Sequence, residues 1–593
     1  MLFEEAATYY EKLEGTSSRL GMIDIMSEML AKSGKNEIRN LIYMTQGLLA
    51  PPFEGVEMGI AEKLAEEAIA IATGSNKKEI EARFRKTGDM GVAAEQLSKE
   101  SKLRRLSKKK FDVNEVFETM TKIAATSGAG SKEAKIRLLA GLLAASGPTE
   151  VRYLVRFALG NLRLGAGDAT ILEALSKSYT GERKAKEELE SAYNRCCDLG
   201  AVAEVLEKSG MKGIENFKVT LFKPVRPALA ERLPTAEEIL ERMHGKCAAE
   251  SKYDGLRAQI HVQKGQKRVE IFSRRLEKVT DMFPEIAKAS LSEVDCKEVM
   301  FEGEAISYDE ITDQFRPFQE TMQRKRKHGI EEKSLELPLH LFAFDLLYLN
   351  GEDCTSKPYA ERRRLLERII KKAGTIRLAD MITATSAKEL EKYFETAIGN
   401  GLEGIIAKDL AAPYVAGARK FSWIKMKRSY KGSLSDTIDV VIVGYYLGKG
   451  ARTEFGFGGL LCAVYNEEKD VFQTVTKIGT GFTEEMMKEF RKTLEKTKVN
   501  KQPARVEALV EPDFWVEPKY VVTVLADEIT KSPMHTASIH DEDGINVGYA
   551  LRFPRIVGGG IRQDKGPQDV TTTKEVEEMF RQQRKTKAEE SAS

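Results

Sequence analysis

The spacing of apolar residues changes near residue 218, and this change requires the chain to fold as more than one domain. Before it, segments such as GMIDIMSEMLAK and KEAKIRLLAGLLAA repeat apolar residues three and four positions apart, as one face of a helix does. After the proline-containing segment KVTLFKPVRPALAERLP, which reads as a linker, RAQIHVQKGQKRVEIFS and LHLFAFDLLYL are typical of strands. A length of 593 residues also exceeds what one hydrophobic core supports.

A third pattern begins near residue 431. The segments DTIDVVIVGYYLG, FGGLLCAVYN and DVFQTVTKIG are short strands at hairpin spacing, which favours a small β-barrel. After Arg555 we expect no further strands, only one helix with a frayed end in the charged tail. The predicted architecture is multidomain: an all-α domain at 1–217, an α+β domain at 218–430, and a β-barrel with a C-terminal helix at 431–593.

Charge and composition narrow the class of protein. Apolar residues make up 42% of the chain and charged residues 31%, which excludes a disordered or fibrous chain. The net charge is only +2, so nucleic-acid affinity must come from local patches such as 102–110 and 324–327, although each is as typical of a solvated helix face. We expect a cytoplasmic protein, because no apolar run suits a membrane helix, the first residues are acidic where a secretory signal is basic, and the six cysteines form no C-x-x-C pair.

The sharpest local motif is SKYDGLR at residues 251–257. By itself a K-x-D-G string is equally typical of a surface turn. As a functional motif it makes Lys252 a nucleophile. Its amine must then lose a proton, although the ordinary pKa of a lysine is about 10.4. Cationic neighbours or a metal ion favour the neutral amine, and Arg257 is a candidate neighbour.

Further strings follow at long intervals: IFSRRLEKVT, FEGEAIS, RPFQETMQRKRK, FAFDLLYLNG, EGIIAK, WIKMK, LRFPR and IRQDK. Together with SKYDGLR, and in this order, they resemble the ATP-dependent DNA ligases of the archaeal and eukaryotic replicative type. The strings GVEMGIAEK and YLVRFALGNLRLGAGDATILEAL are similar to the helical DNA-binding domain of the same ligases, so the likeness spans nearly the whole chain. The resemblance implies a DNA-binding domain, an adenylation (nucleotidyltransferase) domain and an OB-fold, in the three predicted segments.

The resemblance also implies a reaction. Lys252 attacks the α-phosphate of ATP, pyrophosphate leaves, and the lysine carries AMP. The AMP then passes to the 5′-phosphate of a nick in double-stranded DNA, and the adjacent 3′-hydroxyl displaces it to seal the strand. Such enzymes serve DNA replication, repair and recombination. Dividing one difficult condensation into phosphoryl transfers gives each step a good leaving group.

Nucleotide-binding roles follow position by position from the family motifs. Glu250 matches the residue that accepts a hydrogen bond from the adenine amine, and Phe344 matches the ring that stacks on adenine, although a lone Phe in an apolar strand is otherwise a core residue. The remaining matches are Arg257 and Arg274 on sugar and phosphate (with Arg275 as the alternative to Arg274), Lys408 on the nucleotide phosphates, Lys425 and Lys427 facing one anion, Arg419 as another nucleotide contact, and Arg562 and Lys565 with Asp564 on pyrophosphate.

Carboxylates supply the implied metal site. Glu304 and Glu403 match family residues near the metal, and Glu302 shares a strand face with Glu304 because side chains alternate along a strand. Oxygen donors without His or Cys suit Mg²⁺. We therefore expect ATP and magnesium as cofactors and no structural zinc.

The last motif departs from the family. IVGGG separates Arg555 from Arg562, a wider gap than relatives show, and three successive glycines add flexibility. In the family the barrel swings toward the nucleotide for the first step and then turns to embrace DNA, and we expect the hinge at 427–435.

DNA contact is expected on all three domains, mainly the helical one, through phosphates and with little sequence preference. Arg152, Arg156, Arg163 and the glycine turn 165–167 are the predicted phosphate contacts. The implied partners are nicked duplex DNA and, by resemblance, a sliding clamp, although the 108–111 segment has one aromatic residue where clamp-binding peptides have two. We expect a monomer, associated with the nucleoid and with no membrane.

Other classes share parts of the pattern. An RNA ligase or an mRNA-capping guanylyltransferase shares the lysine motif and the barrel but needs neither the helical half nor the PFQ and RKRK strings. NAD-dependent ligases carry a four-cysteine zinc module that these cysteines cannot form. A non-catalytic architectural DNA-binding protein leaves the ordered lysines and glutamates unexplained. Whether ADP or NAD replaces ATP stays open.

Overall fold

The computed structural model describes residues 1–101, 110–309, 314–315, 337–370, 374–400, 402–427, 437–448, 456–542 and 545–592, together with Thr321, Arg324, Ile330 and Ser334. The chain divides into two compact units. One contains Met1–Glu190, Asp198–Glu215 and Gly432–Ser593, and the other contains Ser191–Cys197 and Asn216–Lys431. The predicted hinge, apart from Lys427, and most of the basic segments 102–110 and 324–327 lie outside the described residues.

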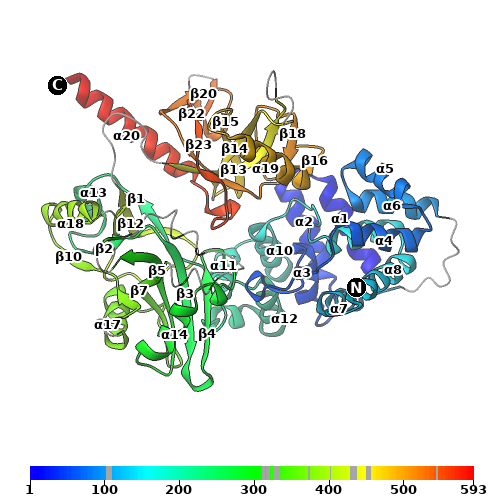
Figure 1. Ribbon diagram of the computed structural model, residues 1–593, viewed down its shortest axis with the longest axis horizontal. Helices are drawn as coiled ribbons and strands as arrows, with labels where there is room; N and C mark the ends of the chain where they lie inside the picture. Colours follow the sequence, from blue (N-terminus) through cyan, green and yellow to red (C-terminus); the bar gives the residue numbers. More distant parts are fainter. Residues whose placement is uncertain are drawn as a thin grey trace. The chain divides into compact units, whose positions relative to one another are not determined.

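The N-terminal region is helical, as predicted (Figure 1). Its helices begin at residues suited to helix starts: the side chains of Asn76 and Asp112 cap α5 and α7, and Pro148 opens α9. The helices are α1 (Phe3–Gly15), α2 (Arg19–Ala31), α3 (Ile38–Gln46), α4 (Glu62–Thr73), α5 (Lys77–Thr87), α6 (Met90–Glu100), α7 (Val113–Ala125), α8 (Ser131–Ala145), α9 (Pro148–Ala158), α10 (Asp168–Thr180), α11 (Lys186–Cys196) and α12 (Leu199–Glu215).

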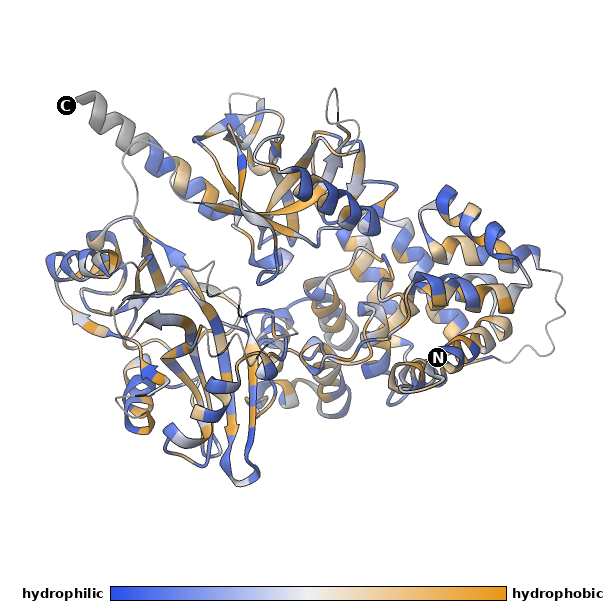
Figure 2. Cartoon of the chain, viewed as in Figure 1, coloured by the Kyte–Doolittle hydropathy of each residue, from blue (hydrophilic) through white to orange (hydrophobic). Residues whose placement is uncertain are grey.

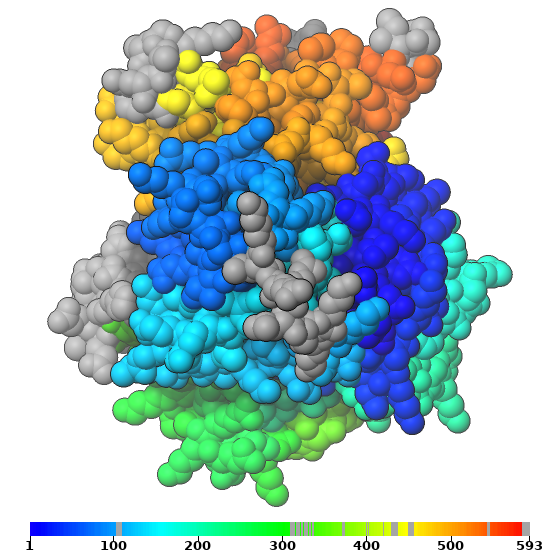
Figure 3. Space-filling model, turned by 90° about the vertical axis from the view of Figure 1, so that its right-hand side faces the viewer, coloured from blue at the N-terminus to red at the C-terminus, as the bar shows by residue number. Residues whose placement is uncertain are grey.

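Apolar side chains form the interior of these helices, which carry hydrophobic residues along one side and hydrophilic residues along the other (Figure 2). The space-filling view shows their outer faces, in blue and cyan, packed closely against one another (Figure 3). The predicted core positions of GMIDIMSEMLAK are buried, among them Met22, Ile23, Met26 and Leu30.

A buried ion-pair network corrects two predicted DNA contacts. Arg156 is 4% exposed and binds the carboxylates of Glu14 and Asp89 at 2.9 Å each. Arg152 donates to Glu95 at 2.6 Å. These guanidinium groups join α9 to α1 and α6 inside the domain, because charges removed from water must be paired. The expectation that Arg152 and Arg156 contact DNA phosphates is therefore wrong.

The central region is α+β, as predicted, and contains two sheets. The first has the order β1-β12-β11-β2-β10, and α13 and α18 pack on it. Its elements are β1 (Leu229–Arg232), α13 (Ala236–Arg242), β2 (Cys247–Lys252), β10 (Met381–Ala384), α18 (Ala387–Gly399), β11 (Gly404–Lys408) and β12 (Arg419–Lys427). The end of the predicted linker is thus a strand, since β1 pairs with β12 in parallel.

The second sheet has the order β4-β3-β5-β7-β8, with β6 on β5 and β9 on β7, and α14 and α17 contribute to its core. The predicted pair of strands around a Lys-Gly turn is the antiparallel pair β3 and β4. The elements are β3 (Leu256–Gln263), β4 (Arg268–Ser273), α14 (Pro284–Glu293), β5 (Glu298–Asp309), β6 (Gln314–Phe315), β7 (Leu339–Leu349), β8 (Glu352–Asp353), α17 (Tyr359–Ile369) and β9 (Ile376–Leu378).

Arg324, from the second basic segment, is not a surface residue. It is 1% exposed, and its guanidinium binds Glu285 of α14 at 2.6 Å. The expectation of a basic patch is therefore wrong at this position.

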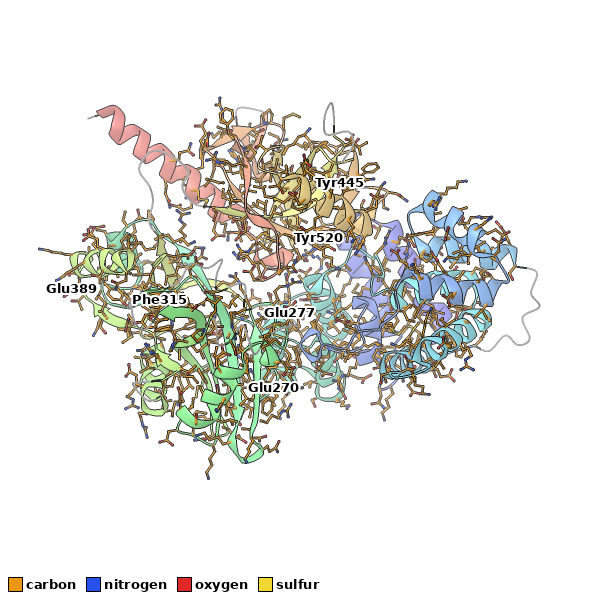
Figure 4. All side chains as sticks on the ribbon, in the orientation of Figure 1. Glu270, Glu277, Phe315, Glu389, Tyr445 and Tyr520 are labelled. Carbon is orange, nitrogen blue, oxygen red and sulfur yellow. The ribbon has the colours of Figure 1, made fainter. Side chains whose placement is uncertain are left out.

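The C-terminal region is rich in β-structure. The predicted hairpin strands are β13, β14 and β15, paired antiparallel in sequence order, and Tyr445 of β13 donates a hydrogen bond to Glu495 at 2.9 Å (Figure 4). The elements are β13 (Ile438–Tyr446), β14 (Gly459–Asn466), β15 (Val471–Ile478), α19 (Glu484–Leu494), β16 (Lys498–Val499), β17 (Val506–Glu507), β18 (Phe514–Val516), β19 (Val521–Leu525), β20 (Glu528–Ser532), β21 (Ala537–Glu542), β22 (Ile545–Arg552), β23 (Arg555–Arg562) and α20 (Thr573–Ala592).

The glycine segment belongs to a strand, which corrects the expectation that strands end at Arg555. In the pairing of β19 with β23, Thr523 faces Val557 and the adjacent Val522 faces Ile561. Residues 558–560 therefore bulge out of the ladder, each with a positive φ that glycine adopts without strain. The helix predicted for the tail is α20.

Candidate active site

Lys252 is the last residue of β2 and precedes the turn at residues 253–255 that leads into β3. The buried ring of Tyr253 anchors this turn, stacking on Phe342 with the centroids 4.6 Å apart. It also makes an edge-to-face contact with Phe315, with the ring centroids 5.4 Å apart; Phe315 is labelled in Figure 4. Aromatic packing of this kind fixes the course of the turn. Lys252 therefore leaves the sheet from a rigid position.

The ammonium of Lys252 forms an ion pair with the carboxylate of Glu403, the residue before β11. The backbone N–H of Glu403 also donates to the Lys252 carbonyl at 3.2 Å. The Nζ atom of Lys427 lies 3.5 Å from the same carboxylate oxygen. Lys252 keeps 22% of its side chain exposed, so a substrate can reach it.

Three carboxylates act on Lys252, and the ammonium of Lys427 shares the Glu403 oxygen with it, so the environment differs from the cationic one that was expected. Burial alone would lower the pKa of Lys252, but the negative charges of Glu403, Glu304 and Asp254 outweigh burial and leave the pKa above its ordinary value. Arg257, the expected cationic neighbour, is engaged elsewhere. Lys252 is therefore protonated in the nucleotide-free protein and must lose a proton before it can attack phosphorus.

Glu304 lies on β5, opposite Arg257 in the ladder of β3 with β5. Burial raises the pKa of Glu304 to about 7, although the positive charges of Lys252, Arg257 and Arg274 oppose the shift. Glu304 is thus a carboxyl group that changes its charge near neutral pH, within the electrostatic reach of the candidate nucleophile.

Glu302 is not placed to bind a metal, so this predicted ligand is wrong. Its side chain is 0% exposed. It accepts hydrogen bonds from Arg257 at 2.8 Å, from the Tyr414 hydroxyl at 2.7 Å and from Gln259 at 3.3 Å. Strand alternation places Glu302 and Glu304 on the same face, as predicted, but three donors occupy Glu302 below the surface.

Arg257 and Phe344 lie together. Arg257 also donates to the Ala228 carbonyl at 2.7 Å, and its guanidinium carbon lies 5.4 Å from the ring centroids of Phe344 and of Trp423. The Phe344 ring meets Trp423 edge to face and stays partly exposed. A partly exposed ring beside a guanidinium can stack on a planar base.

Lys408 does not face the nucleophile, so its expected role on the nucleotide phosphates is wrong. It is 1% exposed, and its Nζ lies 2.6 Å from Glu250 and donates to the Phe344 carbonyl at 2.9 Å. The rings of Trp423 and Tyr359 lie within 4.2 and 4.6 Å of the same nitrogen. Burial lowers the pKa of Lys408 below its ordinary value despite the Glu250 carboxylate.

Strand register explains why two lysines of one sheet face differ so much. Lys252 pairs with Gly404, which pairs with Lys427, whereas Lys408 lies opposite Ala248 and Trp423. Side chains alternate along strands, so these residues share one face at different heights. Glu250, Ile406 and Lys425 form the intermediate row on that face.

The other predicted cofactor residues have defined positions. Arg274 follows β4, and its charge acts on Glu304. Arg275, the alternative, lies 3.9 Å from Glu277. Arg419 begins β12, and its side chain lies outside the described part of the structure.

Arg562 and Lys565 belong to the other compact unit. Arg562 donates to Asp564 at 2.7 Å and lies 3.6 Å from Asp439 of β13. Lys565 forms an ion pair with the same Asp439. These two cations hold the pKa of Asp439 below its usual value, although burial opposes the shift.

Some side chains of this network were not predicted. Tyr359 and Arg363 of α17 contact Glu250, Tyr414 contacts Glu302, and Asp439 contacts the last motif. In the sequence, YAERRRLLER reads only as a charged amphipathic helix. These contacts join segments far apart in the chain, so spacing along the sequence carried no signal for them.

The donor set near Lys252 suits magnesium. Within the described residues, no group of three or more His, Cys, Asp or Glu side chains could hold a metal ion. Mg²⁺ needs fewer protein ligands, because it takes one or two carboxylates and completes its shell with substrate phosphates and water. Glu403 and Glu304 are carboxylates of this kind.

Three family models match successive parts of the chain: the DNA ligase N terminus at residues 2–176, the ATP dependent DNA ligase domain at 227–427 and the ATP dependent DNA ligase C terminal region at 453–565. The chain is 48% identical over 590 residues to a protein named "Probable DNA ligase" from Dictyoglomus thermophilum, covering 100% of this chain and 99% of the relative. It is 41% identical over 602 residues to a DNA ligase of Saccharolobus solfataricus, again covering 100% and 99%.

A solved structure of a mycobacterial DNA ligase D complexed with ATP and MES is 24% identical and covers 58% of this chain and 97% of its own, with a TM-score of 0.33. The sequence relatives and family models define an enzyme of the DNA ligase class. The chain belongs to the ATP-dependent DNA ligase family, whose members seal nicks in DNA through an adenylate intermediate. The predicted three-domain architecture of helical, nucleotidyltransferase and β-rich domains is confirmed. No described helix is both long and apolar enough to cross a membrane.

Proposed function

We propose that Lys252 is the nucleophile of this ligase and carries AMP between the two halves of the reaction. The observation that supports this role most strongly is the ion pair of Lys252 with Glu403 at the edge of a sheet face that also carries Glu250, Lys425 and Lys427. One carboxylate thus contacts the amine, and two lysines lie on β12, the strand on the other side of β11.

In the proposed first step, Nζ of Lys252 leaves its ion pair with Glu403 and loses a proton to water. The nitrogen forms a bond to the α-phosphorus of ATP while the bond from that phosphorus to the bridging oxygen breaks, and pyrophosphate leaves. The AMP then moves to the 5′-phosphate of a nick. The 3′-hydroxyl attacks that phosphate, AMP leaves, and the strand is joined.

The nucleotide roles are assigned by motif and position. Glu250 accepts from the adenine amine, and the partly exposed Phe344 ring stacks on the base. Arg257 and Arg274 bind sugar and phosphate, since guanidinium groups donate paired hydrogen bonds to oxyanions. The phosphate-binding residues are Arg419, Lys425 and Lys427, with Arg562 and Lys565 on pyrophosphate.

Magnesium is proposed as the metal cofactor, held by Glu403 and Glu304. When bound with ATP, Mg²⁺ neutralises phosphate charge in the transition state. The protein's own contribution is to present two carboxylates beside Lys252 and to keep one of them, Glu304, at a pKa of about 7.

We assign the helical domain to 1–217, the adenylation domain to 218–430 and the OB-fold with its C-terminal helix to 431–593. Nicked duplex DNA is the substrate. Arg163 lies 3.4 Å from Asp89 but keeps 21% of its side chain exposed, and with the turn at 165–167 it stays a predicted phosphate contact. A monomer that docks on a sliding clamp and acts at the cytoplasmic nucleoid is the arrangement proposed by resemblance. Phosphate-dominated binding predicts that nick affinity falls steeply with salt.

Labelled ATP tests the proposal directly. The full chain, discharged with pyrophosphate and then given ATP labelled in the α-phosphate and magnesium, is expected to form an acid-stable labelled protein band. Lys252→Ala should abolish the label and the sealing of a nicked duplex, while Lys420→Met, an exposed lysine of the same sheet, should keep both. An adenylyl group mapped by mass spectrometry to another residue would refute the assignment.

A further inference from the structure

Glu250 lies inside a cage of three donors, of which Tyr359 and Arg363 come from outside the ligase motifs. Its side chain is 3% exposed. The Oε2 atom binds Nζ of Lys408 at 2.6 Å, and the Oε1 atom accepts from the Tyr359 hydroxyl and faces Arg363 at 3.4 Å. Two cations and one phenol thus surround one carboxylate.

A count of hydrogen-bonding capacity shows what this cage leaves available. An ionised carboxylate only accepts, and each oxygen offers about two lone pairs. Tyr359 and Arg363 occupy both positions on Oε1, whereas Lys408 occupies one of two on Oε2. One acceptor position on Oε2 therefore remains, and an amino group fits it while a carbonyl oxygen does not.

The ammonium of Lys408 is also fully engaged. It donates to Glu250 and to the carbonyl of Phe344, and the Trp423 ring lies 4.2 Å away. An ammonium has three donors, so a carboxylate, a carbonyl and an aromatic face account for them. Lys408 therefore has no donor left for a phosphate.

One ammonium thus joins two residues with different roles toward a base. Glu250 is proposed to bind the amino group of the base, and Phe344 is proposed to stack on the base. Lys408 binds the side chain of Glu250 and the backbone carbonyl of Phe344. Helix α17 supports the same pair, since Arg362 binds Asp345, the residue after Phe344, at 2.7 Å, with both side chains fully buried.

From this arrangement we infer that Lys408, with Tyr359 and Arg363, sets the preference of the enzyme for a 6-aminopurine nucleotide. These are positioning residues: they fix the direction of the Glu250 carboxylate, so that its remaining acceptor position recognises the amino group of adenine. A base without the amino group leaves the fixed Glu250 oxygen without a hydrogen-bond donor. The free-energy cost of this unpaired oxygen disfavours binding of such a base. The inference rests on the proposed role of Glu250.

The test compares two nucleotides that differ only in the amino group: ATP and purine riboside triphosphate, which lacks it. Transfer to Lys252 is followed by intact mass on the discharged full chain with magnesium, at nucleotide concentrations below saturation. The wild type should prefer ATP. Lys408→Met should reduce this preference at least about 10-fold, mainly by slowing the reaction with ATP, and so should Glu250→Gln.

Tyr359→Phe provides a milder change that removes one hydroxyl from the cage, and it should lower the preference by about 3-fold or more. If Lys408→Met does not fold, Tyr359→Phe decides the test by the same ratio. Lys420→Met, an exposed lysine at the start of β12, should leave the preference unchanged.

Two results would overturn the inference. Equal slowing with both nucleotides would mean that Lys408 acts on phosphates or only supports the fold, and an unchanged preference would mean that the cage does not aim Glu250. Failure of the proposed function looks different, because the wild type would then carry no nucleotide on Lys252 at all.

Discussion

At the scale of single residues, burial and neighbours give the same side-chain type different chemistry. Lys252 is partly exposed among carboxylates, which hold its pKa above the ordinary value, whereas burial lowers the pKa of Lys408 despite its carboxylate partner. Glu302 is fully buried and accepts from three donors, and Glu304, two residues along the strand, has a pKa of about 7. Residue type alone therefore does not identify the reactive groups.

Glu304 gives a prediction about pH and stability. Its pKa is about 7 in the folded protein and 4.5 as the unperturbed value, so the folded state retains a proton that the unfolded state releases. The stability of this unit should therefore fall as the pH rises from about 4.5 to about 7, by at most about 3 kcal/mol. In discharged protein without magnesium, Glu304→Gln should melt at a higher temperature than the wild type at pH 8.

The difference between the two proteins should disappear near pH 4.5, where both forms of residue 304 are neutral. The matched control is Glu237→Gln, an exposed carboxylate on α13, which should show no such pH dependence. A gap in melting temperature that persists unchanged at pH 4.5 would mean that the glutamine acts through packing and not through charge.

At the scale of elements, β11 is the strand that organises the site. It pairs with β2 on one side and β12 on the other, so it fixes Glu250 and Lys252 against Lys425 and Lys427. Gly404 begins the strand with a φ of +149°, and a Cβ at this position would clash with the carbonyl oxygen of Met426.

Substitution of Gly404 tests this role. Gly404→Ala should destabilise the adenylation domain by about 1–3 kcal/mol, because the alanine needs both a strained backbone and a shift of β12. It should also reduce the labelling of Lys252, whose partner Glu403 precedes the glycine. Thermal unfolding and the α-labelled ATP assay measure the two effects, and Gly265→Ala, in an open turn with space for a methyl group, is the control. A stable Gly404→Ala protein with full labelling would contradict the argument.

The sequence predicts shared strand faces and hairpin pairings correctly where a motif lies on one strand or on two consecutive strands. Alternation correctly placed Lys425 with Lys427 on a shared face, and the hairpins of β3 with β4 and of β13 to β15 followed from apolar spacing. It failed for Lys408, Glu302 and Arg156, because burial depends on which distant segments cover a residue. Spacing could not reveal that α17 lies against Glu250, nor that the glycine segment continues a strand.

At the scale of the whole molecule, the residues proposed for the first step are divided between the two compact units. Lys252 and Glu250 belong to one unit, and Arg562 and Lys565 belong to the other, where Asp439 holds them. The proposed pyrophosphate contacts are needed only while ATP is present. Steps after adenylylation therefore should not depend on them.

This division predicts a step-specific defect. Arg562→Ala should reduce labelling of the discharged protein by ATP at least about 100-fold, since a charged contact to the leaving group is lost. Sealing of a nick that already carries AMP on its 5′-phosphate should stay within about 3-fold of the wild type. Arg581→Ala, an exposed residue of α20, is the control. Equal losses in both assays would place Arg562 in a general structural role.

The bulge formed by Gly558, Gly559 and Gly560 bears on how this protein tolerates changes in chain length. The ladder resumes with Ile561 opposite Val522. The extra residues therefore stay within the bulge, and Arg562 still pairs with Val521. The number of residues in the bulge can therefore change while the strand pairings on both sides of it stay the same. Arg562 keeps its place opposite Val521 after the bulge, so the wider gap in the motif does not shift this arginine along the strand.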